Sequence, residues 1–281
     1  MRMLRAVCAM VLVFSAEAAY AQQRPLVTED PEPVGAGRVL LESGVDLLHG
    51  QHYPVSGLEG DLVRVPTVGV SVGLSSIAEL QIDGGLHEQL SITKRNPAPL
   101  SSLLNVTGES TSDVSDIVIG TKVRLLSEQG GRPAVGIRFA TKLPNASNES
   151  GLGLDTTDFF ASLLAAKNVQ SVRVVGNVGF AILGDPTSGN RQNDVLTYGV
   201  SIARALTEKA EVVGEVNGRA NTRSAGPLPG TETRSAMRLG GRYTTGSVRL
   251  DAGAIVGLTN AGPTIGMTAG LTWVFNAFKV P

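Results

Sequence analysis

IVIGTKVRL, the stretch from Ile117 to Leu125, alternates between two kinds of side chain with a period of two. Its odd-numbered residues are apolar or threonine, whereas its even-numbered residues include Lys122 and Arg124. Successive side chains of a β-strand point to opposite faces, so a period of two indicates a strand. We therefore expect a strand with one apolar face and one charged face.

The same alternation recurs along most of the chain. We count twelve such segments, each long enough for a tilted strand, of roughly 9–11 residues, to cross a bilayer. They cover residues 38–48, 62–74, 77–90, 114–126, 133–143, 155–166, 171–183, 194–206, 209–220, 233–243, 247–258 and 264–278. The even number and the two-faced strands predict one closed antiparallel β-barrel over residues 38–278.

The connections between these segments alternate between long and short almost without exception. A transmembrane barrel has short periplasmic turns and longer outer loops. A soluble β-sandwich, the alternative fold, gives no reason for this alternation. The pattern therefore favours an all-β transmembrane barrel. If residues 244–245 form the short turn before the eleventh segment, Arg238 faces Asp251 across two strands.

Composition excludes several classes of function. The chain has 281 residues, with 24 Lys and Arg against 25 Asp and Glu, so it offers no basic surface for nucleic acid. One cysteine and three histidines make no zinc motif and no disulfide framework. No phosphate-binding loop is present. We expect no cofactor, no metal and no nucleic-acid partner.

The N-terminus has the pattern of an export signal. Arg2 and Arg5 precede the apolar run 6–14, and Ala19-Tyr20-Ala21 matches a cleavage site. Nine apolar residues are too few for a membrane anchor, which needs about 20. We predict a signal peptide at residues 1–21, cleaved near Ala21. The polar, proline-containing residues 22–37 then lie in the periplasm or enter the barrel as a plug.

Charged residues of the strands must face the lumen, because Arg or Lys on the lipid face costs about 2–4 kcal/mol at the bilayer midplane. They either pair across strands and fill the interior or line a substrate path. The candidates are Glu79, Asp83, Lys122, Arg124, Arg138, Lys142, Asp158, Arg173, Glu211, Glu215, Arg238, Arg242, Arg249 and Asp251, together with Arg38, Glu42, Asp46 and Arg219.

The last strand ends in aromatic residues close to the C-terminus. Gly270, Trp273, Phe275 and Phe278 resemble the signal that outer-membrane barrels present to their insertion machinery. Such signals commonly stop at the final Phe, whereas this chain continues to Pro281. Glycines within strands, such as Gly136 and Gly240, are expected to relieve crowding in a closed barrel.

Several short motifs, in order, resemble the outer-membrane family of phenol meta-degradation pathways, whose members are described as transporters. The resemblance covers residues 24–278. The motifs are Pro25-Leu26-Val27-Thr28-Glu29-Asp30, Gly35-Ala36-Gly37, Val65-Pro66, Gly73-Leu74, Glu79-Leu80, Gly120-Thr121-Lys122, Leu143-Pro144 and Gly176-Asn177-Val178-Gly179. The resemblance implies an outer-membrane barrel of a Gram-negative bacterium that takes up small, often aromatic compounds. Residues 145–150 depart from the family's glycine-rich stretch.

We therefore expect passive diffusion of a small molecule, with outer-membrane lipid, lipopolysaccharide and the insertion machinery as further partners. Pro66 marks either a sideways exit or a simple strand bend. Two alternatives remain open. One is a structural or adhesive barrel. The other is an outer-membrane hydrolase, although His49, His52 and His87 stand in no recognisable Ser-His motif and we expect no catalytic residue.

Overall fold

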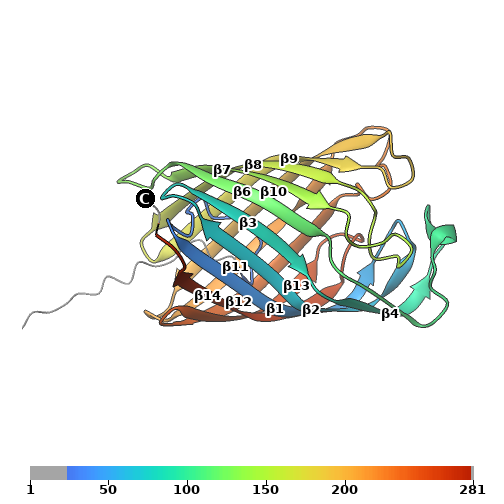
Figure 1. Ribbon diagram of the computed structural model, residues 1–281, viewed down its shortest axis with the longest axis horizontal. Helices are drawn as coiled ribbons and strands as arrows, with labels where there is room; N and C mark the ends of the chain where they lie inside the picture. Colours follow the sequence, from blue (N-terminus) through green and yellow to red (C-terminus); the bar gives the residue numbers. More distant parts are fainter. Residues whose placement is uncertain (1–23, 280–281) are drawn as a thin grey trace, which may run out of the picture.

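The computed structural model describes residues 24–279, and the predicted signal peptide falls outside this range. The strands form a closed antiparallel barrel (Figure 1). They are β1 (Arg38–His52), β2 (Leu58–Gly73), β3 (Ala78–Gly85), β4 (Glu88–Arg95), β5 (Ser110–Asp113), β6 (Ile117–Leu126), β7 (Ala134–Leu143), β8 (Asp158–Val169), β9 (Val172–Gly184), β10 (Gln192–Ala205), β11 (Ala210–Asn221), β12 (Arg234–Thr245), β13 (Val248–Gly257) and β14 (Ile265–Asn276). One turn of 3-10 helix, η1 (Ser101–Leu103), lies between β4 and β5.

The barrel closes because β1 pairs with both β2 and β14. Two barrel strands are interrupted. Both β3 and β4 pair with β2, so they are two halves of one strand that breaks at Leu86 and His87. In the same way β5 continues β6, because β5 pairs with β4 and β6 pairs with β3. Counted in this way the barrel has twelve strands, which confirms the predicted fold.

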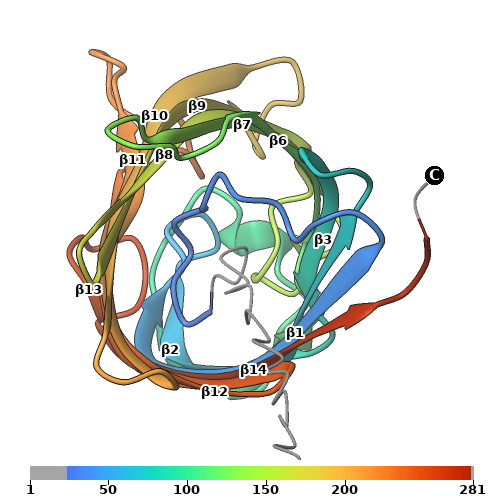
Figure 2. The same cartoon turned by 90° about the vertical axis from the view of Figure 1, so that its left-hand side faces the viewer.

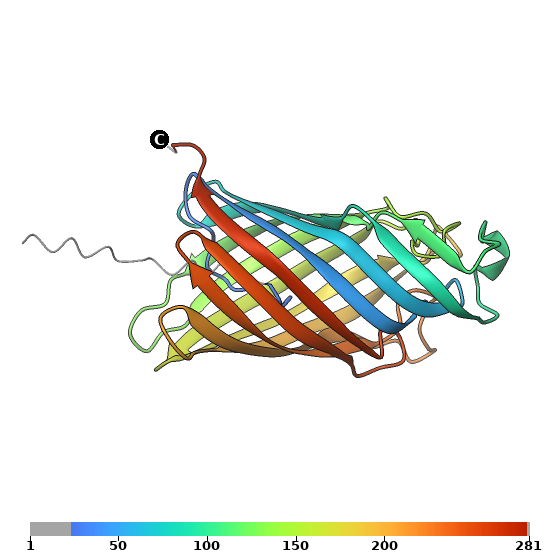
Figure 3. The same cartoon turned by 90° about the horizontal axis from the view of Figure 1, so that it is seen from below.

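Short turns and long loops lie at opposite ends of the barrel, as Figure 1 shows. We call these the short-turn end and the long-loop end. Residues 74–77, 127–133, 170–171, 206–209 and 246–247 connect strands at the first, beside the C-terminus. Residues 53–57, 96–109, 144–157, 185–191, 222–233 and 258–264 connect strands at the second. Figure 3 shows the blue-green strand β4 at the long-loop end of the barrel, where it pairs with the first half of β2.

The predicted alternation of faces places apolar side chains on the outside. Phe139 and Val200 are each 56% exposed and Met267 is 67% exposed, whereas Lys122 and Glu79 are fully buried in the lumen. An apolar exterior combined with a charged interior is the reverse of a water-soluble protein. The part of the chain in residues 24–279 contains no helix of the length and hydropathy that a membrane crossing requires.

Several predicted boundaries were wrong at the long-loop end. The first connection is 53–57 and not a longer loop of about 13 residues, because β1 continues to His52 through an irregular register with β2. The segment predicted as one strand over 77–90 breaks before His87 and then runs to Arg95. Hydrogen-bonded pairing of β4 with β2 extends this strand to Arg95, although the alternation of apolar and polar residues ends earlier in the sequence.

The predicted pairing of Arg238 with Asp251 was also wrong. Thr245 pairs with Val248, so Gly246 and Ser247 form the turn and Arg238 faces Ile255. Gly246 has a φ of +60°, which the tight hairpin requires and glycine adopts without strain. The two threonines before it are β-branched and continue the strand. The shift places Arg242 opposite Asp251.

Candidate functional site

Residues 24–37, which we call the N-terminal segment, lie inside the barrel (Figure 2). The segment leaves β1 at the short-turn end, where the Gly37 N–H donates to the Gly73 carbonyl at 2.9 Å. It then follows the inner wall, with contacts to β3, β6, β9 and β11. This peptide has no secondary-structure ladder of its own, so side chains of the wall must satisfy its backbone groups.

Carboxylates of the wall accept hydrogen bonds from the backbone of the segment. The Val34 N–H donates to Glu79 at 2.5 Å, and the Val27 and Thr28 N–H groups donate to Glu215 at 2.8–3.0 Å. Hydrogen bonds to a charged acceptor are stronger than those between neutral groups. Glu79 and Glu215 thus hold the segment at two points on opposite sides of the lumen.

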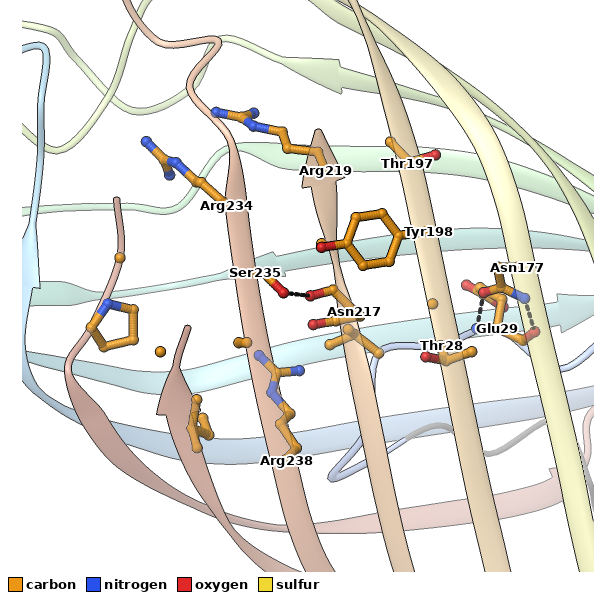
Figure 4. Close-up of a pocket in the computed structure, with 18 of the residues that line it drawn as sticks. Thr28, Glu29, Asn177, Thr197, Tyr198, Asn217, Arg219, Arg234, Ser235 and Arg238 are labelled. Atoms are coloured by element: carbon orange, nitrogen blue, oxygen red, sulfur yellow. Dashed lines mark hydrogen bonds between the residues drawn. The ribbon is translucent and has the colours of Figure 1, made fainter. Parts of the chain in front are cut away.

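An amide pair holds the segment between these points. The Glu29 N–H donates to the Asn177 Oδ1, and the Asn177 Nδ2 donates back to the Glu29 carbonyl, both at 2.7 Å (Figure 4). Asn177 therefore supplies both groups that a neighbouring strand would supply to the segment. The Asn177 side chain fixes the position of Glu29 along β9.

The Glu29 side chain lies in a buried cluster of charges. Its carboxylate is 3.0 Å from the Arg138 Nε and 3.4 Å from the Lys122 Nζ. Lys122 also lies 3.0 Å from Glu79, directly opposite it on β3. Burying one of these charges alone would be costly, whereas a connected set of opposite charges compensates much of that cost. Loss of one member would leave the others uncompensated.

Two further ion pairs lie nearer the short-turn end. Asp30 accepts from both Nε and Nη2 of Arg173, the latter at 2.6 Å, and Glu32 pairs with Arg124. Arg173 also lies 3.4 Å from Glu128 in the turn after β6. Burial raises the pKa of Glu128, but hydrogen bonds from the Asn168 N–H and from Lys167 outweigh it, so the pKa lies below its usual value.

Arg24 is the first described residue of the N-terminal segment, and its side chain contacts three strands of the wall. The Arg24 guanidinium donates to Thr67 at 3.0 Å and to Thr268 at 2.8 Å, and lies 3.5 Å from Asp251. Arg242 donates to the Arg24 carbonyl at 2.7 Å. Arg24 therefore links β2, β13 and β14 through the lumen.

Glycines of the wall leave the space that the segment occupies. An added Cβ at each of seven strand positions would meet segment atoms within 4 Å, and these positions are Gly44, Gly73, Gly136, Gly199, Gly240, Gly253 and Gly270. An added Cβ at Gly176 would meet no atom within 4 Å, so crowding explains only some of the glycines.

Of the fourteen lumen-lining candidates, eight contact the N-terminal segment. They are Glu79, Lys122, Arg124, Arg138, Arg173, Glu215, Arg242 and Asp251. The other six pair among wall residues. Lys142 contacts Asp158 and Asp116, Asp83 lies 3.7 Å from Arg138, Arg238 lies 3.6 Å from Glu215, and Arg249 lies 3.9 Å from Glu211.

The proposed insertion signal lies along β14 and just beyond it. Trp273 and Phe275 share the outer face, with ring centroids 4.5 Å apart, and Phe278 is exposed after the strand ends. Gly270 faces inward against Arg24. Two aromatic rings at the short-turn end are in the position of an interfacial girdle.

Residues 24–279 enclose cavities in the lumen, and three of them are named by their place in the barrel. The mouth cavity, of about 520 Å³, has Leu48, Phe160, Arg219, Arg234 and Arg238 in its wall. The wall cavity, of about 660 Å³, has Gly84, Ser115 and Val118 in its wall and shares Phe160, Arg238 and Ile255 with the mouth cavity. The base cavity, of about 200 Å³, is lined by Gln170, Arg173 and Arg249 near the short turns. The N-terminal segment contributes residues to all three.

Sequence reasoning missed two arginines of the mouth cavity, Arg64 and Arg234. Arg234 has the same even-numbered phase as Arg238 and Arg242, so the alternation could have found it at the start of its strand. Arg64 was obscured by Pro66, which interrupts the pattern two residues later. Its Nε lies 2.9 Å from Glu88.

Two of the three histidines, His49 and His52, lie near the end of β1 beside the long loops. His49 pairs with Asp61 at 2.8 Å, and the His52 Nδ1 contacts the Asn260 carbonyl at 2.9 Å, both at the exposed long-loop end. Within residues 24–279 no cluster of three or more His, Cys, Asp or Glu could hold a metal ion.

Comparison with known proteins gives a family and a fold. An outer-membrane channel from Pseudomonas putida F1 superimposes with a TM-score of 0.60 at 12% identity, covering 88% of this chain and 98% of that chain. The translocator domain of the autotransporter NalP from Neisseria meningitidis gives 0.50 at 13% identity, covering 86% and 89%. No curated protein matches the chain significantly in sequence.

At these identities the structural likeness establishes the fold of an outer-membrane barrel. The sequence pattern of a family described as "Putative MetA-pathway of phenol degradation" matches residues 49–275. This match runs from the end of β1 to the end of β14. The chain therefore belongs to this phenol-degradation family.

Proposed function

We propose that the chain is an outer-membrane channel through which small, largely apolar molecules diffuse passively. The observation that carries this proposal is the pair of adjoining cavities in the lumen, with volumes of about 520 and 660 Å³. Both volumes lie in the range of about 300–1,000 Å³ that is typical of sites for small organic ligands. The family to which the chain belongs is named for the breakdown of phenol.

The proposed orientation follows from the loops. Short turns face the periplasm and long loops face outward in outer-membrane barrels. Lipid and lipopolysaccharide would then surround the apolar exterior, and the insertion machinery would recognise the strand that ends in Trp273 and Phe275. A solute would enter between the long loops and reach the mouth cavity first.

Part of the wall of the mouth cavity is apolar and suits a molecule with a large apolar surface. Leu48 and Ile255 line the mouth cavity and belong to a buried apolar cluster with Leu58, Leu62 and Leu90 at the long-loop end. Ala236 packs against this cluster from β12. An apolar surface inside an otherwise charged lumen favours solutes that water-filled pores exclude.

The N-terminal segment lies between the two larger cavities and the base cavity, and supplies wall residues on each side. We infer that it moves aside when a solute passes. Its anchors are side-chain contacts and not a strand ladder, so they can break without opening the barrel wall.

The function is tested by solute entry into vesicles that carry lipopolysaccharide in the outer leaflet, because plain phospholipid already passes apolar solutes. Phenol, benzoate and xylose should be compared in vesicles with and without the folded protein. We expect faster entry of the two aromatic solutes than of xylose. Entry of all three at the rate of protein-free vesicles would exclude the channel and favour a structural barrel.

A further inference from the structure

Two arginines face each other across neighbouring strands in the mouth cavity. Arg219 of β11 pairs in register with Arg234 of β12. Both side chains line the cavity, and Figure 4 shows them together at one end of it. Like charges directly opposite one another destabilise a sheet. The arrangement therefore requires an explanation beyond filling the interior.

Neither arginine has a close carboxylate partner. Arg219 donates to two backbone carbonyls, of Glu232 at 3.0 Å and of Gly230 at 2.6 Å, and makes no ion pair within residues 24–279. Arg234 comes only within 4.0 Å of Glu232, and its Nε is buried without a hydrogen-bond partner. A buried donor without a hydrogen-bond partner lowers the stability of the folded protein, so its presence calls for a functional explanation.

A third arginine extends the cationic surface towards the N-terminal segment. Arg238 lies two positions inward from Ala236 on the same face of β12, and its Nε is also buried without a hydrogen-bond partner. Its ion pair with Glu215, at 3.6 Å, is long, since Glu215 is already bonded to the N–H groups of Val27 and Thr28.

Apolar side chains form other parts of the cavity wall. Ile255 lies on β13, next to β12, Leu48 lies on β1, and Phe160 and Leu164 lie across the lumen on β8. The cavity is therefore two-sided, with free guanidinium N–H groups at one end and an apolar surface beside them. A ligand that satisfies both must be an anion with an apolar body.

We propose that the mouth cavity binds a small carboxylate with an apolar body, with its carboxylate on Arg219 and Arg234. A guanidinium presents paired N–H donors that match the two oxygens of a carboxylate. One negative charge would also relieve the repulsion between the two arginines. The inference rests on the proposed function, because it names the class of solute that the channel accepts.

The test is binding to the folded, detergent-solubilised protein, measured by calorimetry with benzoate, benzamide and acetate. Benzamide has the shape of benzoate without its charge, and acetate has the charge without the apolar ring. We expect benzoate to bind at least about tenfold more tightly than either, which is a difference of roughly 1.4 kcal/mol.

Variants locate the site. Arg234→Gln should weaken benzoate binding by about tenfold and leave benzamide binding unchanged, because the Arg234 Nε has no hydrogen-bond partner within residues 24–279 that the change would remove. Arg219→Gln should act in the same direction. Arg223→Gln is the matched control, since Arg223 lies on an exposed loop outside the cavity. Migration of unheated protein on a gel checks that each variant is folded.

Equal affinity for benzoate and benzamide would overturn the proposal, as would equal loss of binding in Arg223→Gln and Arg234→Gln. Vesicle entry separates this failure from failure of the channel. If aromatic solutes enter but benzoate is not preferred in binding, the carboxylate site is wrong and the channel stands. If benzoate binds as expected but no solute enters, the site stands and the channel is wrong.

Discussion

At the scale of single residues, glycines of the barrel wall leave space in the lumen for the N-terminal segment. Gly270 and Gly44 face each other across β14 and β1, and an added Cβ at either would meet the Arg24 guanidinium. The wall and the N-terminal segment are therefore complementary at these positions. A methyl group here would compete with the segment for the same space.

We predict that Gly270→Ala destabilises the protein by about 1–3 kcal/mol, the usual cost of overpacking. The added Cβ would lie 2.5 Å from the Arg24 Nε and 2.5 Å from the Ser43 carbonyl oxygen. The measurement is the temperature at which the fast-migrating folded form disappears on a gel. Gly176→Ala is the matched control, and because its Cβ meets nothing within 4 Å it should be neutral or slightly stabilising. Equal effects of the two changes would contradict the prediction.

At the scale of the elements, register decides which charges meet. β11 and β12 place Glu215 opposite Arg238 and Glu211 opposite Arg242. β12 and β13 place Arg242 opposite Asp251. Arg238 and Arg242 thus each have an acidic residue on one or both neighbouring strands, whereas Arg234 of the same strand faces Arg219.

Glu215 and Arg238 should therefore be coupled in stability. We expect the double variant Glu215→Gln with Arg238→Gln to be less destabilised than the sum of the single variants, with a coupling of about 0.5–3 kcal/mol. Urea unfolding in detergent measures each free energy. Arg223→Gln combined with Glu215→Gln supplies the reference pair and should be additive. Strict additivity of Glu215 with Arg238 would show that their 3.6 Å contact contributes nothing.

The N-terminal segment is the element on which passage depends. A Cβ at Gly199 would lie 3.5 Å from the Cβ of Thr28, within the range that a disulfide spans. The sequence has one cysteine, Cys8, which lies in the predicted signal peptide. An introduced pair at these positions would therefore have no competing thiol in the exported chain.

We predict that oxidising the double variant Thr28→Cys with Gly199→Cys stops solute entry and that a reductant restores it. The disulfide would fix the segment to β10 and prevent it from moving aside. The Thr28→Cys variant alone, treated with the same oxidant, should keep its entry rate, and the reduced double variant shows any effect of the added side chain at Gly199. Unchanged entry through the fully cross-linked protein would mean that solutes pass beside an immobile segment.

At the scale of the whole molecule, closure removes the edges that other sheets must protect. Each of the twelve barrel strands has two neighbours along most of its length, because β1 joins β14 as well as β2, and the short β5 pairs on one side with β4. A closed sheet offers no edge at which unfolding can begin. The exterior is largely apolar, so the folded barrel also requires detergent or lipid.

We therefore expect the unheated protein to migrate faster than the boiled protein on a denaturing gel. We also expect it to aggregate when detergent is removed. Circular dichroism before and after heating would show whether the slower form has lost its strands. A monodisperse, detergent-free solution would contradict the membrane assignment.

The sequence by itself determined the strand number, the two faces of each strand and the ends that carry the long loops. These features are local, since the period-two pattern and the turn residues lie next to one another in the chain. For the same reason it identified Lys122, Arg173 and Glu215 as inward-facing. The partners of these residues could not be read in the same way.

Only the tertiary structure decided the register of β12 with β13 and the place of the N-terminal segment. The register depends on whether Gly246 or the preceding threonines form the turn, and alternation is the same in both cases. The segment has no periodic pattern, and Asp30 contacts Arg173, 143 residues away. The position of the segment follows from ion pairs with the wall and from the space left beside wall glycines, and both exist only after the barrel has closed.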